Sequence, residues 1–351
     1  MNASPRTRRR FSRVVVLSAF AYPAALLLLV LGLYFIGERW WVTAAGLYVP
    51  RVPFVAPLPV LVMLLWVTGR KRLLWTQVLA ALIALFPLLG FILPLPWPAK
   101  ASRGPRLRVL SMNVDSARGG AERIATQIAA LSPDVVLLQE SPWNGGELLP
   151  LLAARFPYVA SSTQFTIASR HRIIETTSPP EIPAYGTQLF PNFMRYVLDT
   201  PLGPIAFFSV HPTSPRGLMG IGQFRGAVHQ VRTGKFLAGD PAGEVAENAG
   251  MRTLQIATAS AAAARESLPL IIAGDTNLPG LSPVFRKYLT SYTDGFRAAS
   301  WGFGYTYSYR RPFLRLDRIL ASQELRFVSF EVGCPDLSDH RCVVADIQAL
   351  P

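Results

Sequence analysis

The residues best suited to chemistry stand at the ends of short apolar runs. The clearest case is the stretch 270–277, where Leu-Ile-Ile-Ala is followed by Gly-Asp-Thr-Asn. Because side chains alternate faces along a strand, Asp275 and Asn277 point the same way and can address one small ligand together. Gly and Asp also end strands for purely structural reasons, so this motif alone predicts a strand end and leaves its function open.

The same pattern repeats earlier in the chain. The apolar run 107–112 is followed by Asn113 and Asp115, and the apolar run 135–138 leads into Glu140. A segment with apolar residues at helical spacing separates the two runs, which gives the order strand, helix, strand. In α/β sheets ligands bind at the carboxyl ends of the strands, so we expect these polar side chains to share one edge.

Two imidazoles and two further carboxylates fit this arrangement. His211 follows the strand-like run 205–210, Asp317 stands within an apolar run, and Asp339 and His340 immediately precede the last strand-like segment. A buried carboxylate is costly unless it is paired, and imidazole is its natural partner. We therefore expect Asp317 to pair with a histidine.

Taken in order, these motifs resemble those of the endonuclease/exonuclease/phosphatase superfamily, which includes deoxyribonuclease I, abasic-site endonucleases, sphingomyelinases and inositol-polyphosphate phosphatases. The resemblance covers about residues 106–349. It rests on Ser-Met-Asn113, Gln139-Glu140, Ser169-Arg170, Val-His211, Gly-Asp275-Thr-Asn277, Arg315-Leu-Asp317-Arg-Ile and Ser338-Asp339-His340. It implies a deoxyribonuclease I-like four-layer α/β sandwich, with two mixed sheets face to face between helices, and metal-assisted hydrolysis of a phosphate ester.

The resemblance also implies a metal site. By position Glu140 is the metal ligand, helped by Asn113 and Asp339, with Asp115 as a further candidate. Oxygen ligands without a Cys or His cluster suit Mg²⁺ or Mn²⁺.

The remaining motif residues take catalytic roles by the same resemblance. Asp275 and Asn277 hold and activate the attacking water, and His340, oriented by Asp317, acts as acid or base or binds a phosphoryl oxygen. His211 stabilises charge on the phosphate. The motifs leave open which group removes the proton of the water.

Two departures from the family pattern concern the substrate. Tyr305 to Tyr307 replace a Trp that is common in the late aromatic segment, and the Gly-rich stretch 214–249 is an unusually long insertion, which we interpret as an irregular loop. Both lie where substrates are selected. The sequence therefore predicts the reaction type but not the substrate.

The apolar and basic composition of the N-terminal third predicts a membrane anchor over residues 1–98. We expect a stiff linker over residues 99–105 and a catalytic domain over residues 106–351. Three apolar segments are candidates for transmembrane helices, about residues 14–36, 52–67 and 73–97, and the middle one is short and contains three prolines. Arginines precede the first segment, and Arg70 to Arg72 precede the third. The positive-inside rule then predicts an anchor in the bacterial inner membrane with the catalytic domain outside the cytoplasm. If the middle segment were re-entrant, this orientation would be inverted.

Charge and cysteine content narrow the alternatives. The first 103 residues hold 12 basic residues and one acid, whereas the remaining 248 hold 23 basic and 20 acidic residues, a net charge of only +3. A nucleic-acid backbone prefers a more basic surface, so nucleic acid is a possible but not a favoured partner. Cys334 and Cys342 are the only cysteines, and the sequence leaves open whether they are joined or free.

The sequence thus predicts a membrane-anchored, metal-dependent phosphoesterase whose substrate is a lipid headgroup or another small phosphate ester. The alternatives are a membrane-anchored endonuclease or exonuclease, and a binding protein on the same fold without activity. The presence of Asp275, Asn277, Asp317, Asp339 and His340 argues against the last of these. The oligomeric state is left open.

Overall fold

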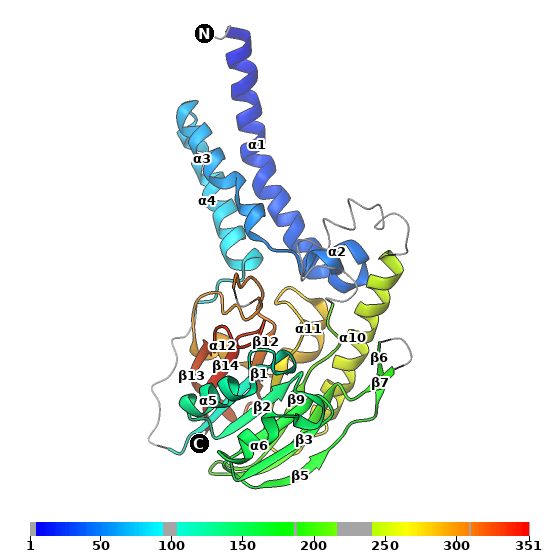
Figure 1. Cartoon of the computed structure of the whole chain (residues 1–351). Coiled ribbons are helices and arrows are strands. Elements are labelled where there is room, and N and C mark those ends of the chain that lie inside the picture. The colour runs from blue at the N-terminus through cyan, green and yellow to red at the C-terminus, as the bar shows by residue number, and fades with distance from the viewer. Residues whose placement is uncertain (1–4, 94–103, 186–187, 216–240, 309, 351) are drawn as a thin grey trace.

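Strands with apolar residues on both faces form two sheets that lie one on the other (Figure 1). The computed structural model describes the chain except for residues 1–4, 94–103, 186–187, 216–240, 309 and 351. In this described part the first sheet has six strands in the order β13-β14-β1-β2-β4-β3, and the second has six in the order β11-β12-β10-β9-β8-β5.

The strands of the first sheet are β1 (Leu107–Asn113), β2 (Val135–Gln139), β3 (Tyr158–Ser162), β4 (Phe165–Ser169), β13 (Leu325–Gly333) and β14 (Cys342–Ala349). Those of the second are β5 (Ile173–Thr177), β8 (Phe193–Thr200), β9 (Gly203–Val210), β10 (Leu270–Asp275), β11 (Thr293–Asp294) and β12 (Asp317–Ala321). β6 (Ile182–Tyr185) and β7 (Gln188–Phe190) form a separate hairpin. β1 pairs with β2 and β9 with β10 in parallel, and the other pairs are antiparallel, so both sheets are mixed.

Helices cover the outer face of each sheet. The helices are α5 (Ala121–Leu131), α6 (Leu148–Ala153), α10 (Pro241–Ala263), α11 (Pro283–Leu289) and α12 (Gly295–Ala299), with short 3-10 turns η6 (Asp115–Ala117) and η7 (Trp143–Gly145). α5 and α6 pack on the first sheet, and α10 and α11 pack on the second. The result is the expected four-layer α/β sandwich.

The alternation of side chains explains these layers. In β1, Val109 points into the core between the sheets, whereas Leu110 points toward α5. In β10, Ile271 and Ala273 join the same inter-sheet core. Ile272 points the other way and packs with α10 and α11 on the outer face of the second sheet. Because both faces of a central strand are buried, its sequence is apolar throughout rather than alternating.

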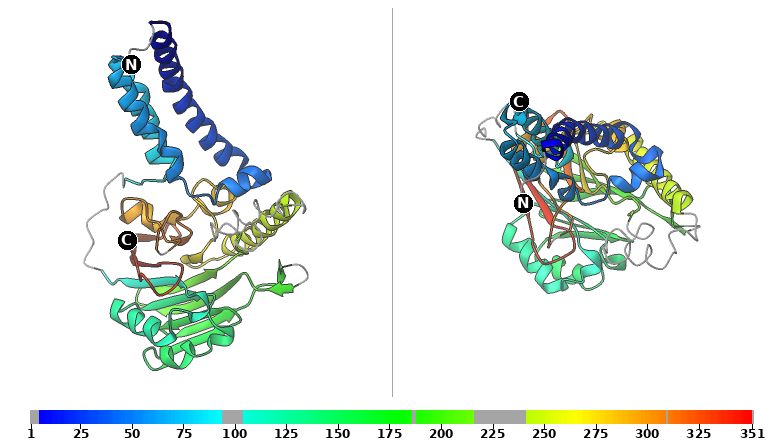
Figure 2. Two further views of the ribbon diagram at one scale, coloured as in Figure 1. Left: turned by 45° about the horizontal axis from the view of Figure 1, so that its top comes forward. Right: turned by 90° about the horizontal axis from the view of Figure 1, so that it is seen from above.

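The N-terminal segment consists of helices that stand out from one end of the sandwich (Figures 1 and 2). They are α1 (Pro5–Leu31), η1 (Gly32–Ile36), η2 (Gly37–Arg39), α2 (Trp41–Gly46), η3 (Val52–Val55), α3 (Pro57–Val67), η4 (Lys71–Leu73), α4 (Leu74–Ile83) and η5 (Ala84–Leu88). Two helical stretches, Arg9–Arg39 and Lys71–Leu88, are long and apolar enough to cross a membrane, whereas Val52–Val67 is shorter.

Two expectations about segment ends need correction. The third apolar segment does not continue as a helix to residue 97: its helix ends at Leu88, and Ile92 forms a bridge with Gly302 of the sandwich. The irregular loop expected over 214–249 is too long, because α10 already begins at Pro241. Residues 216–240 of that stretch, and residues 99–103 of the expected linker, lie outside the described residues.

Candidate active site

The polar residues singled out in the sequence lie at one edge of the two sheets. Asn113 and Asp275 end β1 and β10, and Glu140 directly follows β2. β12 runs antiparallel to β10, so Asp317 at its start lies directly opposite Asp275 in the register. His340 precedes β14, which runs antiparallel to β1 and so starts at the same edge.

An amide connects the carboxylates of the two sheets. Nδ2 of Asn113 donates hydrogen bonds to Glu140 Oε1 at 2.8 Å and to Asp275 Oδ2 at 3.3 Å. Asn113 and Asp275 are fully buried, and Glu140 retains 24% exposure of its side chain. A carboxylate that is accessible to solvent beside two buried groups is a suitable position for a ligand.

His211 lies against both of these carboxylates. Its Nε2 is 3.3 Å from Glu140 Oε1 and 3.8 Å from Asp275 Oδ2, and its Nδ1 lies 2.6 Å from Gln164 Oε1. Burial disfavours the charged imidazole, but Glu140 and Asp275 outweigh this effect and raise the pKa of His211. The sequence expectation for His211 did not include Gln164, which fixes the orientation of the ring.

His340 and Asp317 form the expected pair. His340 Nδ1 lies 2.8 Å from Asp317 Oδ2, and His340 Nε2 lies 3.5 Å from Asp275 Oδ2. Burial opposes the positive charge, yet the carboxylates of Asp317 and Asp275 raise the pKa of His340 to about 10. Both members of the pair are at most 1% exposed, so His340 is a buried cation at neutral pH.

The backbone around this pair is held by the late aromatic segment. Thr306 Oγ1 accepts hydrogen bonds from the backbone N–H groups of Leu316 and Asp317, both at 3.1 Å. The ring of Tyr307 lies 5.0 Å from the imidazole of His340. Thr306 and Tyr307 are therefore supporting residues of the site that the motif analysis did not assign.

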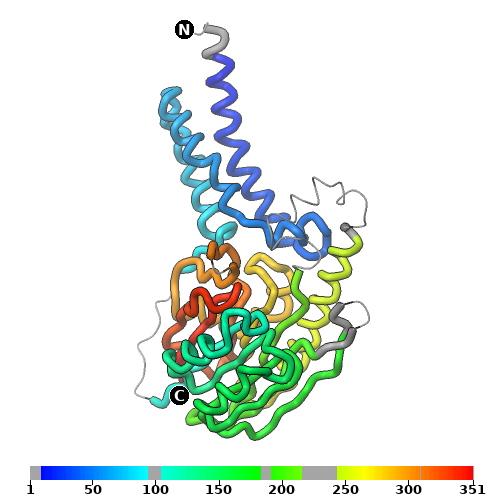
Figure 3. The backbone as a smooth tube through the Cα atoms, viewed as in Figure 1, coloured from blue at the N-terminus to red at the C-terminus, as the bar shows by residue number. Residues whose placement is uncertain are grey.

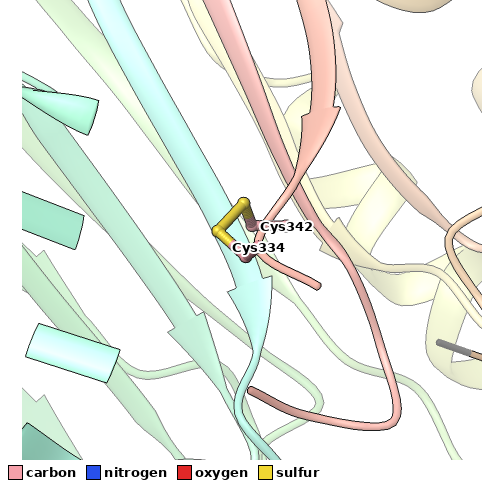
Figure 4. The surroundings of a disulfide bond; sticks show 2 residues. All are labelled: Cys334 and Cys342. Atoms are coloured by element: carbon pink, nitrogen blue, oxygen red, sulfur yellow. A yellow bond between two sulfur atoms is a disulfide. The ribbon is translucent and has the colours of Figure 1, made fainter. Parts of the chain in front are cut away.

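A disulfide closes the loop that carries His340. Cys334 and Cys342 are joined, with their Cα atoms 5.3 Å apart, and Figure 4 shows the bridge beside the strands of the first sheet. This observation answers the question that the sequence left open. The closed loop also carries Asp339, whose charge contributes to the raised pKa of His340. The described contacts do not test its expected role as a metal ligand.

Asn277 contacts its neighbours through both backbone and side chain. Its backbone N–H donates to Asp275 Oδ1 at 2.8 Å, and its Nδ2 donates to the carbonyl of Pro212 at 2.9 Å. Its own carbonyl accepts a hydrogen bond from the hydroxyl of Tyr48 at 2.7 Å. Tyr48 belongs to the N-terminal segment, so this segment reaches the edge of the sandwich that carries the site (Figure 3).

Two of the motif residues have other surroundings. Ser169 pairs with Val135 at the start of β2, so the Ser169-Arg170 turn lies at the edge opposite the site. Asp115 forms an ion pair with Arg118 at 3.1 Å at the end of β1. Its backbone N–H donates to Asn113 Oδ1 at 3.0 Å, so in this geometry Asn113 presents its N–H group, not its oxygen, to the carboxylates.

The donor set fits a divalent cation. Ligand atoms of Asp275, Asp317 and His340 all lie within 4.8 Å of one another, and the two carboxylates supply the oxygens that could hold an ion, since a protonated imidazole cannot bind one. Asn113 connects Glu140, a further carboxylate, to Asp275. Carboxylate oxygens in such number favour Mg²⁺ or Mn²⁺, and of these residues Glu140 has the solvent access that an entering ion requires.

Comparison with known proteins agrees with this geometry. The Endonuclease/Exonuclease/phosphatase family matches residues 110–340, a range that begins in β1 and ends at His340. Members of this family are phosphoesterases and nucleases and typically depend on a divalent metal. No curated protein matches the sequence.

Two solved structures are similar to this chain. An endonuclease/exonuclease/phosphatase from Beutenbergia cavernae is 20% identical, with 70% of this chain and 72% of that chain covered and a TM-score of 0.50. Sphingomyelinase C from Streptomyces griseocarneus is also 20% identical, with 69% of this chain and 99% of that chain covered and a TM-score of 0.46. The edge network and the family match lead to the same conclusion: the chain belongs to the endonuclease/exonuclease/phosphatase family.

Proposed function

We propose that the chain is a membrane-anchored phosphoesterase that depends on Mg²⁺ or Mn²⁺ and hydrolyses a lipid headgroup or another small phosphate ester. One observation carries this proposal. The connected network Glu140, Asn113, Asp275, His340 and Asp317 brings side chains from both sheets to one edge. Several buried charged groups in one place are costly to fold, and such clusters occur where a ligand or a reaction needs them.

The proposed roles follow from charge and exposure. Glu140 is the principal metal ligand, and roles of Asn113 and Asp339 as further ligands stay predictions. A metal ion held there would supply positive charge that polarises the phosphate and makes water more acidic. Because Asp317 and Asp275 raise the pKa of His340 and so favour its protonated form, we assign it the role of hydrogen-bond donor to a phosphoryl oxygen. Activation of the water then falls to Asp275, held in place by Asn277.

His211 and Asp317 complete the proposed machinery. The raised pKa of His211 favours its positive charge, which stabilises the charge that develops on the phosphate. Asp317 orients His340 and keeps it protonated. In-line attack of the water breaks the bond between phosphorus and the ester oxygen.

The arrangement of the N-terminal segment supports membrane anchoring by residues 1–98 and a catalytic domain of residues 106–351. Arg70 Nε donates to Ser12 Oγ at 3.3 Å, so the two basic stretches meet at the end of the helices that is remote from the sandwich (Figure 1). By the positive-inside rule that end is cytoplasmic, and the sandwich lies on the other side of the inner membrane. The disulfide between Cys334 and Cys342 agrees with an oxidising compartment.

The position of the site favours a substrate at the membrane surface. Tyr48 of the N-terminal segment contacts Asn277 directly, so the catalytic edge is the edge nearest to the proposed bilayer. A catalytic site held close to the membrane surface can reach an ester that is itself part of the membrane, or one that is released beside it.

The test is hydrolysis by the full-length protein in phospholipid nanodiscs. A phospholipid, a phosphomonoester, a small phosphodiester and double-stranded DNA are each offered with Mg²⁺, Mn²⁺ or EDTA. We expect turnover that EDTA abolishes, with a preference for a lipid or small ester over DNA. Asp275→Asn should abolish it, whereas Asp336→Asn, an exposed carboxylate beside the site, should not.

A preference for DNA would keep the reaction type and overturn the substrate class. Absence of metal-dependent turnover on all four substrates, by a protein shown to be folded, would contradict the proposed function and favour a binding protein.

A further inference from the structure

A cavity of about 780 Å³ lies where the N-terminal segment meets the sandwich. Its walls come from the ends of the two longest apolar helices, around Tyr34 and Phe86, and from the sandwich around Gly280 and Phe313. The volume is within the range of small-molecule sites. The proposed catalytic residues are not among the described residues that line it, so this is a second site.

The charge of the lining is entirely positive. Three arginines, Arg51, Arg297 and Arg315, line the cavity, and its described walls include no acidic residue. Arg315 pairs with Asp294 at 2.8 Å, but Asp294 also pairs with Arg318 at 3.1 Å. The carboxylate of Asp294, which does not itself line the cavity, is therefore shared by the guanidinium groups of Arg315 and Arg318.

Arg51 is the most unusual of these residues. It is only 7% exposed, its Nη1 and Nη2 donate to the carbonyls of Leu88 and Leu47, and its Nε has no hydrogen-bond partner in the described structure. Burial lowers its pKa to about 10, so the group is still charged at neutral pH. No carboxylate among the described residues forms an ion pair with it. A buried cation without a counter-charge is costly, and an anionic ligand would remove that cost.

Arg297 supplies a second cation in the same cavity. Its side chain is exposed and forms no hydrogen bond or ion pair with the described residues. Two guanidinium groups without a carboxylate partner, one buried and one at the opening, suit a phosphate group, which accepts several hydrogen bonds from arginine.

The rest of the lining is apolar and aromatic. Val30, Phe86, Phe91, Leu93 and Phe303 contribute hydrocarbon surface, and Leu93 remains 52% exposed. Val30 and Phe86 belong to the two helical stretches that are long enough to cross a membrane. An acyl chain on these side chains would continue directly into the bilayer.

We propose that this cavity binds one anionic phospholipid, with its phosphate between Arg51 and Arg297 and its acyl chains along the apolar ends of the helices. The inference rests on the membrane insertion of the proposed function but not on its catalysis. A lipid bound there would contact both the N-terminal segment and the loop that follows Asn277, and would so connect the membrane helices to the sandwich.

The experiment is native mass spectrometry of the full-length protein in detergent with EDTA, after addition of dioleoyl phosphatidylglycerol or dioleoyl phosphatidylcholine. We expect one phosphatidylglycerol to bind about tenfold more tightly, about 1.4 kcal/mol, than phosphatidylcholine, which carries the same phosphate but adds an ammonium group that the arginines would repel. Arg297→Gln should remove this preference. Because its side chain has no partner in the described structure, this variant should fold normally.

A second variant tests the cavity itself. Gly280 lines it, and a Cβ added there would meet no atom within 4 Å, so Gly280→Trp should fill the space without displacing the backbone. It should weaken lipid binding about tenfold at unchanged charge. Arg39→Gln is the matched control, because Arg39 is an exposed arginine at the junction that does not line this cavity, and it should bind as the wild type does.

Three results would overturn the inference: equal binding of the two lipids, unchanged phosphatidylglycerol binding by Arg297→Gln and Gly280→Trp, or displacement of the lipid by inorganic phosphate at equal concentration, which would make the site one for free anions. Since EDTA prevents turnover, the outcome is separate from that of the hydrolysis test. A protein that binds the lipid but hydrolyses no ester would contradict only the proposed function.

Discussion

Replacement of Asp317 by Asn should remove the nearest negative charge beside the buried His340. The variant keeps the size of the side chain and removes the charge that lies 2.8 Å from Nδ1 of His340. The pKa of His340 stands at about 10 against an ordinary value of 6.5, and a rise of that size corresponds to about 5 kcal/mol. Asp317 is the nearest of the carboxylates that cause it. Removal of one partner of a buried ion pair costs about 3–5 kcal/mol, so the loss of this charge should destabilise the protein by an amount of that order.

The pH dependence of this loss has a definite sign. A histidine with a raised pKa contributes its stabilisation fully below its unfolded value and loses it as the pH rises through the folded value. The difference in stability between wild type and Asp317→Asn should thus be largest near pH 6.5 and should shrink as the pH approaches about 10. It should also shrink in acid, because burial raises the pKa of Asp317 above its ordinary value of 3.8, and the wild type then loses the charge that the variant lacks. Turnover should fall by about 10²- to 10⁴-fold, because His340 loses both orientation and charge.

The assay combines thermal unfolding across this pH range with turnover of the best substrate, for the full-length protein. Asp336→Asn is the control, since it removes an exposed carboxylate from the same disulfide-closed loop. Equal stability differences at pH 6.5 and near pH 10 would refute the assignment of His340 as a cation maintained by Asp317. An Asp317→Asn variant with wild-type turnover would refute it as well.

Three further predictions concern the support of the site. Tyr48→Phe removes the hydrogen bond to the carbonyl of Asn277 and should cost about 1 kcal/mol, seen as a lower melting temperature and a several-fold lower kcat; unchanged values would contradict a structural link between the N-terminal segment and the site. Asp294→Asn leaves the buried Arg318 and the partly buried Arg315 without their carboxylate partner and should destabilise the protein by about 3–5 kcal/mol. Because its partners lower the pKa of Asp294 to about 2 from 3.8, this contribution should be present above pH 3.8 and vanish as the pH falls through about 2, and a pH-independent difference would argue against it. Reduction of the bridge between Cys334 and Cys342 should cost about 2–3 kcal/mol in thermal unfolding, and wild-type stability in reductant would contradict its role in fixing the loop.

The motifs, through their resemblance to a known family, were sufficient to predict the layers, and the strand ends predicted which polar residues would lie at one edge. Apolar runs mark the buried strands, and polar residues at their ends converge because the strands share one edge. Asn113 and Asp275 illustrate this, since they are 162 residues apart and yet in contact. The pairing of Asp317 with a histidine was also predictable, because a buried carboxylate needs a partner.

The supporting residues could not be predicted in this way. Gln164 orients His211 across 47 residues, and Tyr48 reaches Asn277 across 229. Each is a single ordinary polar residue without a periodic pattern or a local motif around it. Only the packing of the N-terminal segment on the sandwich brings Tyr48 to the site.

The ends of segments were the other weakness. Composition predicted an apolar segment to residue 97, but the helix ends at Leu88, and Ile92 already pairs with Gly302 of the sandwich. Hydrophobicity alone does not distinguish lipid from protein as the apolar partner. Likewise, the Gly-rich composition around residue 240 predicted an irregular loop, although α10 begins at Pro241.

The central claim is that Glu140 holds a catalytic metal at the edge shared by the two sheets. Its most direct test is turnover of the full-length protein against Mn²⁺ concentration, for the wild type and for Glu140→Gln. We expect the variant to fold normally but to need at least about tenfold more Mn²⁺ for half of its maximal rate, or to show no turnover. The same Mn²⁺ requirement and the same rate in both proteins would contradict it.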